Sequence, residues 1–184
     1  MKRLAALVVI AIAAAPYTVP AEAQQPHAGL EARPIKALSD QQLADLRAGR
    51  GMGLALAAEL NGYPGPTHVL ELAEPLGLSE AQRVKMQELF AAMKAETVPL
   101  GERLIAQEAE LERLFAGRTI TETSLAATMQ AISTTQAALR TAHLKYHLAS
   151  VTVLAPAQIH QYAELRGYSS GEQPKHPPGR HQHQ

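Results

Sequence analysis

The sequence predicts an all-α fold, in which a long antiparallel helical hairpin over residues 79–153 carries short flanking helices within a helical domain of residues 38–167. Three observations support this prediction. Ala, Leu, Gln and Glu are abundant and Trp is absent, a composition that favours helix. Apolar residues recur at steps of three and four along two long stretches. Helix-start signals precede both stretches. Because the chain has no cysteine, packing alone must stabilise the fold.

Residues 1–23 have the organisation of a secretory signal peptide. Lys2 and Arg3 precede an uninterrupted apolar run, Leu4–Ala15, and the small-residue triplet Ala21–Ala23 follows two prolines. The apolar run is too short to anchor a mature protein in a bilayer. We therefore expect export to the periplasm, cleavage after Ala23, and no membrane span in the mature chain.

Two short helices are predicted before the hairpin. Ser39, with Gln42 three residues later, forms a capping box that begins the first of them. The closely spaced glycines that follow weaken this helix, and we expect it to resume over residues 54–60. Pro66 is a typical first residue of a helix, and it predicts a second short helix that ends at Gly77.

The first long helix has the strongest start signal in the chain. Ser79 stands at the N-cap with Gln82 three residues on, and Leu78 can pack back onto the first turn. Pro99 falls inside the helix, and we expect a kink there because the apolar pattern continues on both sides. The residues that follow the helical period are Gln82, Met86, Leu89, Met93, Thr97, Leu100, Leu104, Gln107, Leu111 and Leu114.

The second long helix begins after Thr121, whose side chain can cap it. A short connection requires the two helices to be antiparallel. A lone hairpin of this length leaves an apolar flank uncovered, so we expect a homodimer. The residues that follow the period in this helix are Leu125, Met129, Ile132, Gln136, Leu139, His143, Tyr146, Ser150 and Val153.

Both ends of the mature chain lack periodicity. Residues 24–37 contain Pro, Gly and His, and we expect a flexible leader there. A last helix begins at Pro156 and ends at Gly167. Residues 168–184 are polar and rich in Pro and His, which predicts a disordered tail.

Charge and motifs exclude several classes of function. The chain holds 17 basic and 17 acidic residues, whereas nucleic-acid binding needs a clustered basic face. No Ser–His–Asp order, phosphate-binding glycine loop or cysteine pair is present. We therefore expect a protein that is not an enzyme, that requires no cofactor and that binds no nucleic acid.

The starts of the two helices that flank the hairpin resemble a known motif. Leu78-Ser79-x-x-Gln82 and Leu154-Ala155-Pro156-x-Gln158 are similar to the Leu-Thr-x-x-Gln motif of the Spy/CpxP group of periplasmic stress proteins. That group includes zinc-resistance-associated proteins and CnrX-like heavy-metal sensors. The resemblance covers residues 66–167 and departs from the motif at both threonines. It implies a small four-helix protein, often dimeric, that acts as an ATP-independent chaperone, an inhibitor of a sensor kinase or a metal sensor.

His143 and His147 are the best candidates for chemistry. Their i, i+4 spacing puts both imidazoles on one helix face, close enough to share a zinc, copper, nickel or cobalt ion. The resemblance to CnrX-like sensors implies ligands late in this helix. A third ligand could come from His68 or Glu71 if the short helix that carries them folds over the hairpin. The alternative is that His143 simply forms a hydrogen bond across the hairpin or the dimer interface, for example to Gln107 or Gln136.

The tail offers a second metal hypothesis. His176, His181 and His183 could capture a transition metal, although a disordered terminus of biased composition is the favoured explanation. Methionines at positions 52, 86, 93 and 129 could bind a soft metal, but three of them follow the helical period, which favours core packing.

These observations leave two functions open. The first is a non-enzymatic envelope-stress protein of the Spy/CpxP type that binds unfolded periplasmic proteins or a membrane signalling protein. The second is a heavy-metal sensor or metal-buffering resistance protein. A client surface could be formed by Leu54, Leu56 and Leu60, or by Phe90, Val98 and Ile105, unless these residues cover the second face of the hairpin.

Overall fold

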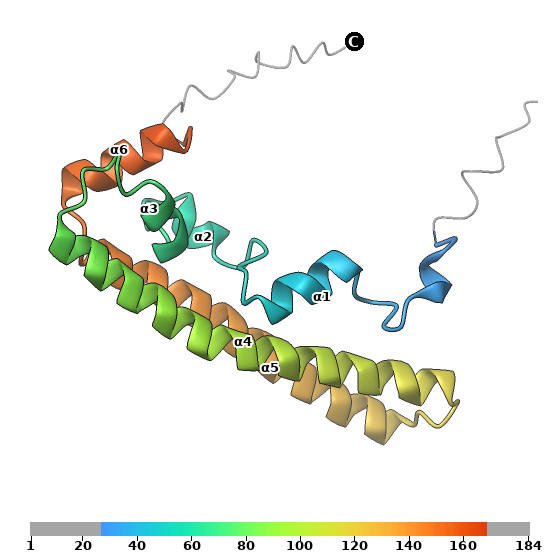
Figure 1. Cartoon of the computed structure of the whole chain (residues 1–184). Helices are drawn as coiled ribbons and strands as arrows, with labels where there is room; N and C mark the ends of the chain where they lie inside the picture. Colours follow the sequence, from blue (N-terminus) through green and yellow to red (C-terminus); the bar gives the residue numbers. More distant parts are fainter. Residues whose placement is uncertain (1–26, 169–184) are drawn as a thin grey trace, which may run out of the picture. The chain divides into compact units, whose positions relative to one another are not determined.

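The computed structural model describes residues 27–168, and it confirms the all-α class, since this part of the chain contains helices and loops but no strand. Residues 27–33 form a separate unit with one short 3-10 helix, Leu30–Ala32. The second unit carries the helices labelled in Figure 1. They are α1 (Asp40–Arg47), α2 (Leu56–Glu59), α3 (Pro66–Glu71), α4 (Glu80–Ala116), α5 (Glu122–Val151) and α6 (Pro156–Leu165). The predicted signal peptide and most of the predicted tail lie outside the described residues.

The two long helices, α4 and α5, begin where the sequence predicts. At the start of α4 the Gln82 amide donates to Ser79 Oγ at 3.2 Å, and the Ser79 amide donates to Gln82 Oε1 at 3.0 Å. Thr121 caps α5 in the same way, with Ser124 as its partner. Pro99 lies inside α4 without ending it. The two helices pack along each other and are joined by residues 117–121 (Figure 1).

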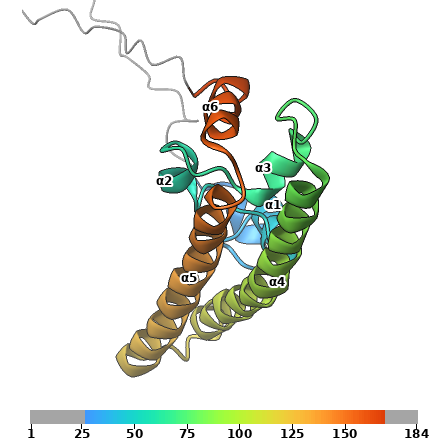
Figure 2. The ribbon, with the colours of Figure 1, turned by 90° about the vertical axis from the view of Figure 1, so that its left-hand side faces the viewer.

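The predicted apolar stripes are buried over only part of their length. Met86, Met93, Thr97 and Leu104 are buried on α4, and Ile132, Leu139, His143 and Ser150 are buried on α5. Near the connection the prediction of burial is wrong, because Leu125 and Met129 are exposed. In Figures 1 and 2, α2, α3 and α6 gather at the opposite end, where α4 begins and α5 ends. The part of the pair near the connection therefore lacks the covering elements that bury the other end.

A reciprocal amide pair joins the first turns of α4 and α6. Gln82 Nε2 donates to Gln158 Oε1 at 2.8 Å, and Gln158 Nε2 donates to Gln82 Oε1 at 3.1 Å. Their remaining amide hydrogens go to the carbonyl oxygens of Val153 and Leu76, at 2.9 and 3.2 Å. Gln82 thus closes the capping box of α4, Gln158 accepts the Ala155 amide at the start of α6, and each glutamine also holds the other helix. The surrounding core contains Val69, Ala73, Leu76, Leu78, Met86, Leu154 and Tyr162.

A second core lies farther along the long helices, and it corrects the prediction of a flexible leader over residues 24–37 at the end of that segment, around Ile35. Ile35 is buried in this core, which also contains Leu46, Leu104, Ile105, Ile132 and Leu139. Lys36 Nζ lies 2.5 Å from Glu112 Oε1. The leader was misjudged because a single apolar residue creates no periodicity, and its burial depends on partners far along the chain.

A glycine on α4 allows α1 to approach this core. A Cβ added at Gly101 would lie 2.3 Å from the carbonyl oxygen of Leu46, closer than real side chains come. Gly101 is therefore required for the close approach of the last turn of α1.

The short helices are shorter than predicted. α2 has four residues and follows a run of turns, and α3 ends at Glu71, so that residues 72–77 form turns instead of helix. α1 packs on α4, α2 packs on α5, and α3 contacts both long helices. Among the helices of residues 27–168, none combines the length and apolarity that crossing a bilayer requires. This arrangement places α2 and α3 over the last turns of α5.

Candidate metal-binding pocket

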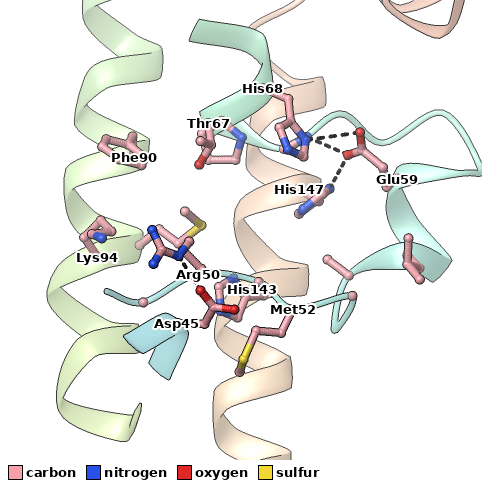
Figure 3. A pocket seen from close by; sticks show the side chains of 18 of the residues that line it. Asp45, Arg50, Met52, Glu59, Thr67, His68, Phe90, Lys94, His143 and His147 are labelled. Carbon is pink, nitrogen blue, oxygen red and sulfur yellow. Dashed lines mark hydrogen bonds and ion pairs between the residues drawn. The ribbon is translucent and has the colours of Figure 1, made fainter. Parts of the chain in front are cut away.

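A pocket of about 480 Å³ lies between the short N-terminal helices and the long helices. Its walls come from the loop after α1, from α2 and α3, and from the first half of α4 and the end of α5 (Figure 3). His68, His143 and His147 all line it, together with Glu59 and Glu71. The pocket therefore brings together residues from segments that are about seventy to ninety positions apart.

The glycine-rich loop forms one wall of the pocket. Gly49, Met52 and Gly53 all have positive φ, at 59°, 44° and 81°. Gly51 faces an imidazole, since a Cβ added there would lie 3.7 Å from His143 Nδ1. These glycines thus allow the chain to turn tightly against a histidine. A nucleotide-binding glycine loop follows a strand, and no strand precedes this loop in the described residues.

Glu59, the last residue of α2, is the buried centre of the site, with 6% of its surface exposed. Its Oε1 accepts hydrogen bonds from the hydroxyls of Tyr162 and Tyr168, the latter at 3.2 Å. Arg166 Nε lies 3.8 Å from the same oxygen. The amide of Gly65 donates to Oε2 at 3.3 Å. The carboxylate is therefore held by α6, by the residues after it and by the turn before α3.

Two histidines complete the surroundings of this carboxylate. His68 Nδ1 lies 3.3 Å from Glu59 Oε1, and His147 Nδ1 lies 3.6 Å from Glu59 Oε2 (Figure 3). Burial by itself raises the pKa of Glu59, but hydrogen bonds from His68 and Tyr162, together with the charges of the two histidines, bring it down to about 2. Glu59 is therefore a carboxylate anion at any pH near neutrality.

The hydrogen bonds of His147 fix which ring nitrogen carries the proton. His147 Nδ1 lies 2.6 Å from the carbonyl oxygen of Tyr63. A carbonyl oxygen can only accept, so Nδ1 donates, and in the neutral ring Nε2 keeps its lone pair. The ring fits closely against the turn before α3, because a Cβ added at Gly65 would lie 2.7 Å from His147 Nε2. His68 presents the same situation, since its Nδ1 faces a carboxylate that can only accept.

His143 lies one turn before His147 and is 3% exposed. Its Nε2 is buried without a hydrogen-bond partner, and so is Oε1 of Gln107. The alternative interpretation of His143, a hydrogen bond from this nitrogen to Gln107 or Gln136, is therefore not found. Burial, and then the nearby charge of His147, lowers the pKa of His143, which favours a neutral imidazole with an available lone pair.

The structure thus brings three of the predicted metal ligands, His68, His143 and His147, into one pocket. Glu71 lies at the same pocket but is exposed. The tail residues His176, His181 and His183 lie outside the described residues. The three histidines line one pocket but do not converge on one point, since within residues 27–168 no group of three or more His, Cys, Asp and Glu side chains is placed so that it could hold a metal ion as it stands.

Glu59 was missed by the sequence analysis. One signal was present, because Glu59 is the only Asp, Glu, Lys or Arg between Arg50 and Glu71. A single charge in an otherwise uncharged segment is a candidate for a specific buried partner. Its partners Tyr162 and His147 are too distant along the chain for any local pattern to reveal them.

Comparison with known proteins adds no identification: no family model matches the sequence, and no curated protein or solved structure matches it significantly. The functional argument therefore depends on the motifs of this chain and on the pocket geometry.

Proposed function

We propose that this protein is a non-enzymatic, periplasmic metal-binding protein of the Spy/CpxP type, acting as a sensor or buffer of zinc, copper, nickel or cobalt. The observation that carries the proposal is the meeting of His68, His143 and His147 at one pocket. Imidazole nitrogens are preferred ligands of these ions. Metal binding would explain why the Nε2 atom of a buried histidine lacks a partner.

The surroundings of the histidines also support a metal site. A histidine that binds a metal usually donates its other ring N–H to a carboxylate or a backbone carbonyl, which fixes the ring and raises its basicity. Tyr63 provides the carbonyl for His147, and Glu59 provides the carboxylate for His68 and His147. For their Nε2 atoms to bind one ion, the three rings must move closer together than they stand in this structure, while Glu59 holds two of the rings through their Nδ1 atoms.

Calorimetric titration of the full chain with Zn²⁺, Cu²⁺, Ni²⁺ and Co²⁺ tests the proposal. His176, His181 and His183 are first replaced by Asn, so that the tail does not contribute. We expect one ion per chain with a sub-micromolar Kd for at least one metal, weakened about 10- to 100-fold or more by His147→Ala, since ligand loss costs at least as much as outer-shell loss.

His160→Ala is the matched control, because His160 is exposed on α6 and its Nδ1 lies 3.5 Å from Glu164 in the next turn. This variant should bind metal as the parent chain does. Absence of binding to the parent chain, or equal losses in the two variants, would contradict the proposal.

A second candidate function is client binding by an envelope-stress protein. It is supported by apolar side chains near the connection between α4 and α5, where Phe115 is 53%, Leu125 is 36% and Met129 is 42% exposed. Leu56 and Leu60 are also exposed, whereas Ile105 is buried and is removed from the predicted client surface. Exposed apolar groups of this kind bind partly folded chains or a second copy of the protein.

Aggregation of a denatured client without ATP tests this second candidate. The parent chain should suppress aggregation, and a Phe115→Ser, Met129→Ser variant should suppress it less. Sedimentation of the same two proteins tests the proposed homodimer, which the double substitution should weaken if the copies meet at this surface. A parent chain that is monomeric and no better than an inert protein would exclude both uses of the surface.

A further inference from the structure

We infer that α6 sets the metal affinity of the pocket, and that Tyr162 does so as a positioning residue acting through Glu59. This inference rests on the proposed metal site. Glu59 contacts both the pocket histidines and α6: it lies against His68 and His147, and it accepts a hydrogen bond from the hydroxyl of Tyr162. Tyr162 is buried, and it belongs to the core formed by α3, α4 and α6.

A histidine of the pocket and the donors from α6 and the residues after it share one oxygen of Glu59. His68 Nδ1 lies near Oε1, which also accepts hydrogen bonds from the hydroxyls of Tyr162 and Tyr168. Arg166 Nε lies 3.8 Å from the same oxygen. An oxygen of a carboxylate has few acceptor positions, and each donor that it accepts reduces the negative charge available to the others. Hydrogen bonds from α6 therefore weaken the hold of Glu59 on the histidines.

A metal ion would change this balance in a definite direction. An ion bound at Nε2 withdraws electron density from the ring, so the opposite N–H becomes a stronger donor and the site gains positive charge. Glu59 then interacts more strongly with His68 and His147, and less with Tyr162. Metal binding and the α6 contact to Glu59 thus oppose each other. By linkage, each must weaken the other by the same factor.

The rest of α6 is held independently of Glu59. Gln158 bonds to Gln82 and to the Leu76 carbonyl, and Gln161 Nε2 donates to the Pro75 carbonyl at 2.8 Å. A metal-dependent change should therefore be confined to the part of α6 and the following residues that face Glu59, while the first turn of α6 stays attached to α4.

Affinity for Co²⁺ and Zn²⁺ in a Tyr162→Phe variant is the first test. The phenyl ring keeps the packing and removes only the hydroxyl. We expect the Kd to fall about fivefold or more, the lower end of usual coupling between sites, and the absorption spectrum of bound Co²⁺ to shift. Gln161→Ala is the control, because it removes another α6 contact without touching Glu59, and its Kd should not change.

Hydrogen exchange of the parent chain with and without Zn²⁺ is the second test. Amides from Tyr162 onward in α6 should exchange faster when the metal is bound, while those of the first turn should not.

The outcomes separate the inference from the function on which it rests. If the parent chain binds no metal, the proposed function fails. If it binds metal in a His147-dependent way, but Tyr162→Phe leaves the Kd unchanged or raises it, or α6 exchange does not respond, then the inference alone is overturned. If Tyr162→Phe and Gln161→Ala change the Kd equally, docking of α6 in general is responsible, and the assigned role of Tyr162 is wrong.

Discussion

Glu59 shows how one side chain can organise a site that has no strong sequence motif. Its carboxylate is buried, yet three hydroxyl or amide donors, two imidazoles and a guanidinium surround it. A buried anion without such partners would be very costly. The same contacts make some of the surrounding groups dependent on Glu59, since the Tyr162 hydroxyl and the Gly65 amide would lose a charged acceptor if the charge were removed.

Glu59→Gln should therefore destabilise the metal-free protein. The glutamine side chain has nearly the same shape, but only one of its two terminal atoms can accept a hydrogen bond. The donors that face the other atom are therefore left buried without an acceptor. We expect the free energy of unfolding to fall by about 1–3 kcal/mol. Urea denaturation with a chelator present measures this change. Glu71→Gln, at the exposed rim of the pocket, should change stability little, and equal effects of the two substitutions would contradict the central role of Glu59.

The low pKa of Glu59 also predicts an acid sensitivity. The folded-state pKa is about 2 against an ordinary value of 4.5, so the folded protein binds this proton less readily than the unfolded chain. The stabilisation from Glu59 is then complete above pH 4.5 and is lost as the pH falls towards 2. Unfolding free energies of the chelated protein at several pH values should show this loss, and Glu59→Gln should show a shallower slope over the same range. Parallel slopes would contradict the assignment.

At the scale of elements, Gln82 and Gln158 do more than cap a helix, because they also bond to each other across two helices. Gln42 closes the capping box of α1 through bonds to Ser39, whereas Gln82 closes a capping box and also reaches α6. The glutamine at each of these two helix starts, of α4 and of α6, thus also holds the other helix start.

Substitution of these glutamines tests the argument. Gln82→Ala should cost more than Gln42→Ala, for which we expect about 0.5–1 kcal/mol from the loss of a cap. A double-mutant cycle of Gln82→Ala and Gln158→Ala should give a coupling energy of about 0.5–3 kcal/mol, the range for residues in one network. Additive losses would show that the two amides act independently.

Gly101 gives a second prediction at this scale. In an exposed helix interior, Gly→Ala stabilises by about 1 kcal/mol. Here the new Cβ would lie 2.3 Å from the Leu46 carbonyl oxygen, so α1 must shift. We expect Gly101→Ala to destabilise by about 1–3 kcal/mol, as overpacking does. Urea denaturation measures the sign directly, and stabilisation would mean that α1 does not depend on this close approach.

For the molecule as a whole, the sequence predicts the features whose residues lie close together along the chain. The caps at Ser39, Ser79 and Thr121 and the two long helices follow from residues within a few positions of each other. The burial of Ile35 and the role of Glu59 could not be predicted, because each depends on partners far along the chain. His68 could be proposed beside His147 only on the condition that α3 covers the long helices, and the contacts of α3 meet that condition.

The hydrogen bond between Glu59 and Tyr162 has a consequence for the order of folding. These residues are 103 positions apart, and His147 lies 84 positions from its partner Tyr63. Contacts of such separation carry a large loop-closure entropy and form late. The long helices, by contrast, are joined by a short connection and pair early. A chain that ends before α6 would therefore acquire its other helices but leave Glu59 without its two tyrosine donors, so the surroundings of Glu59 are complete only after α6 has been made.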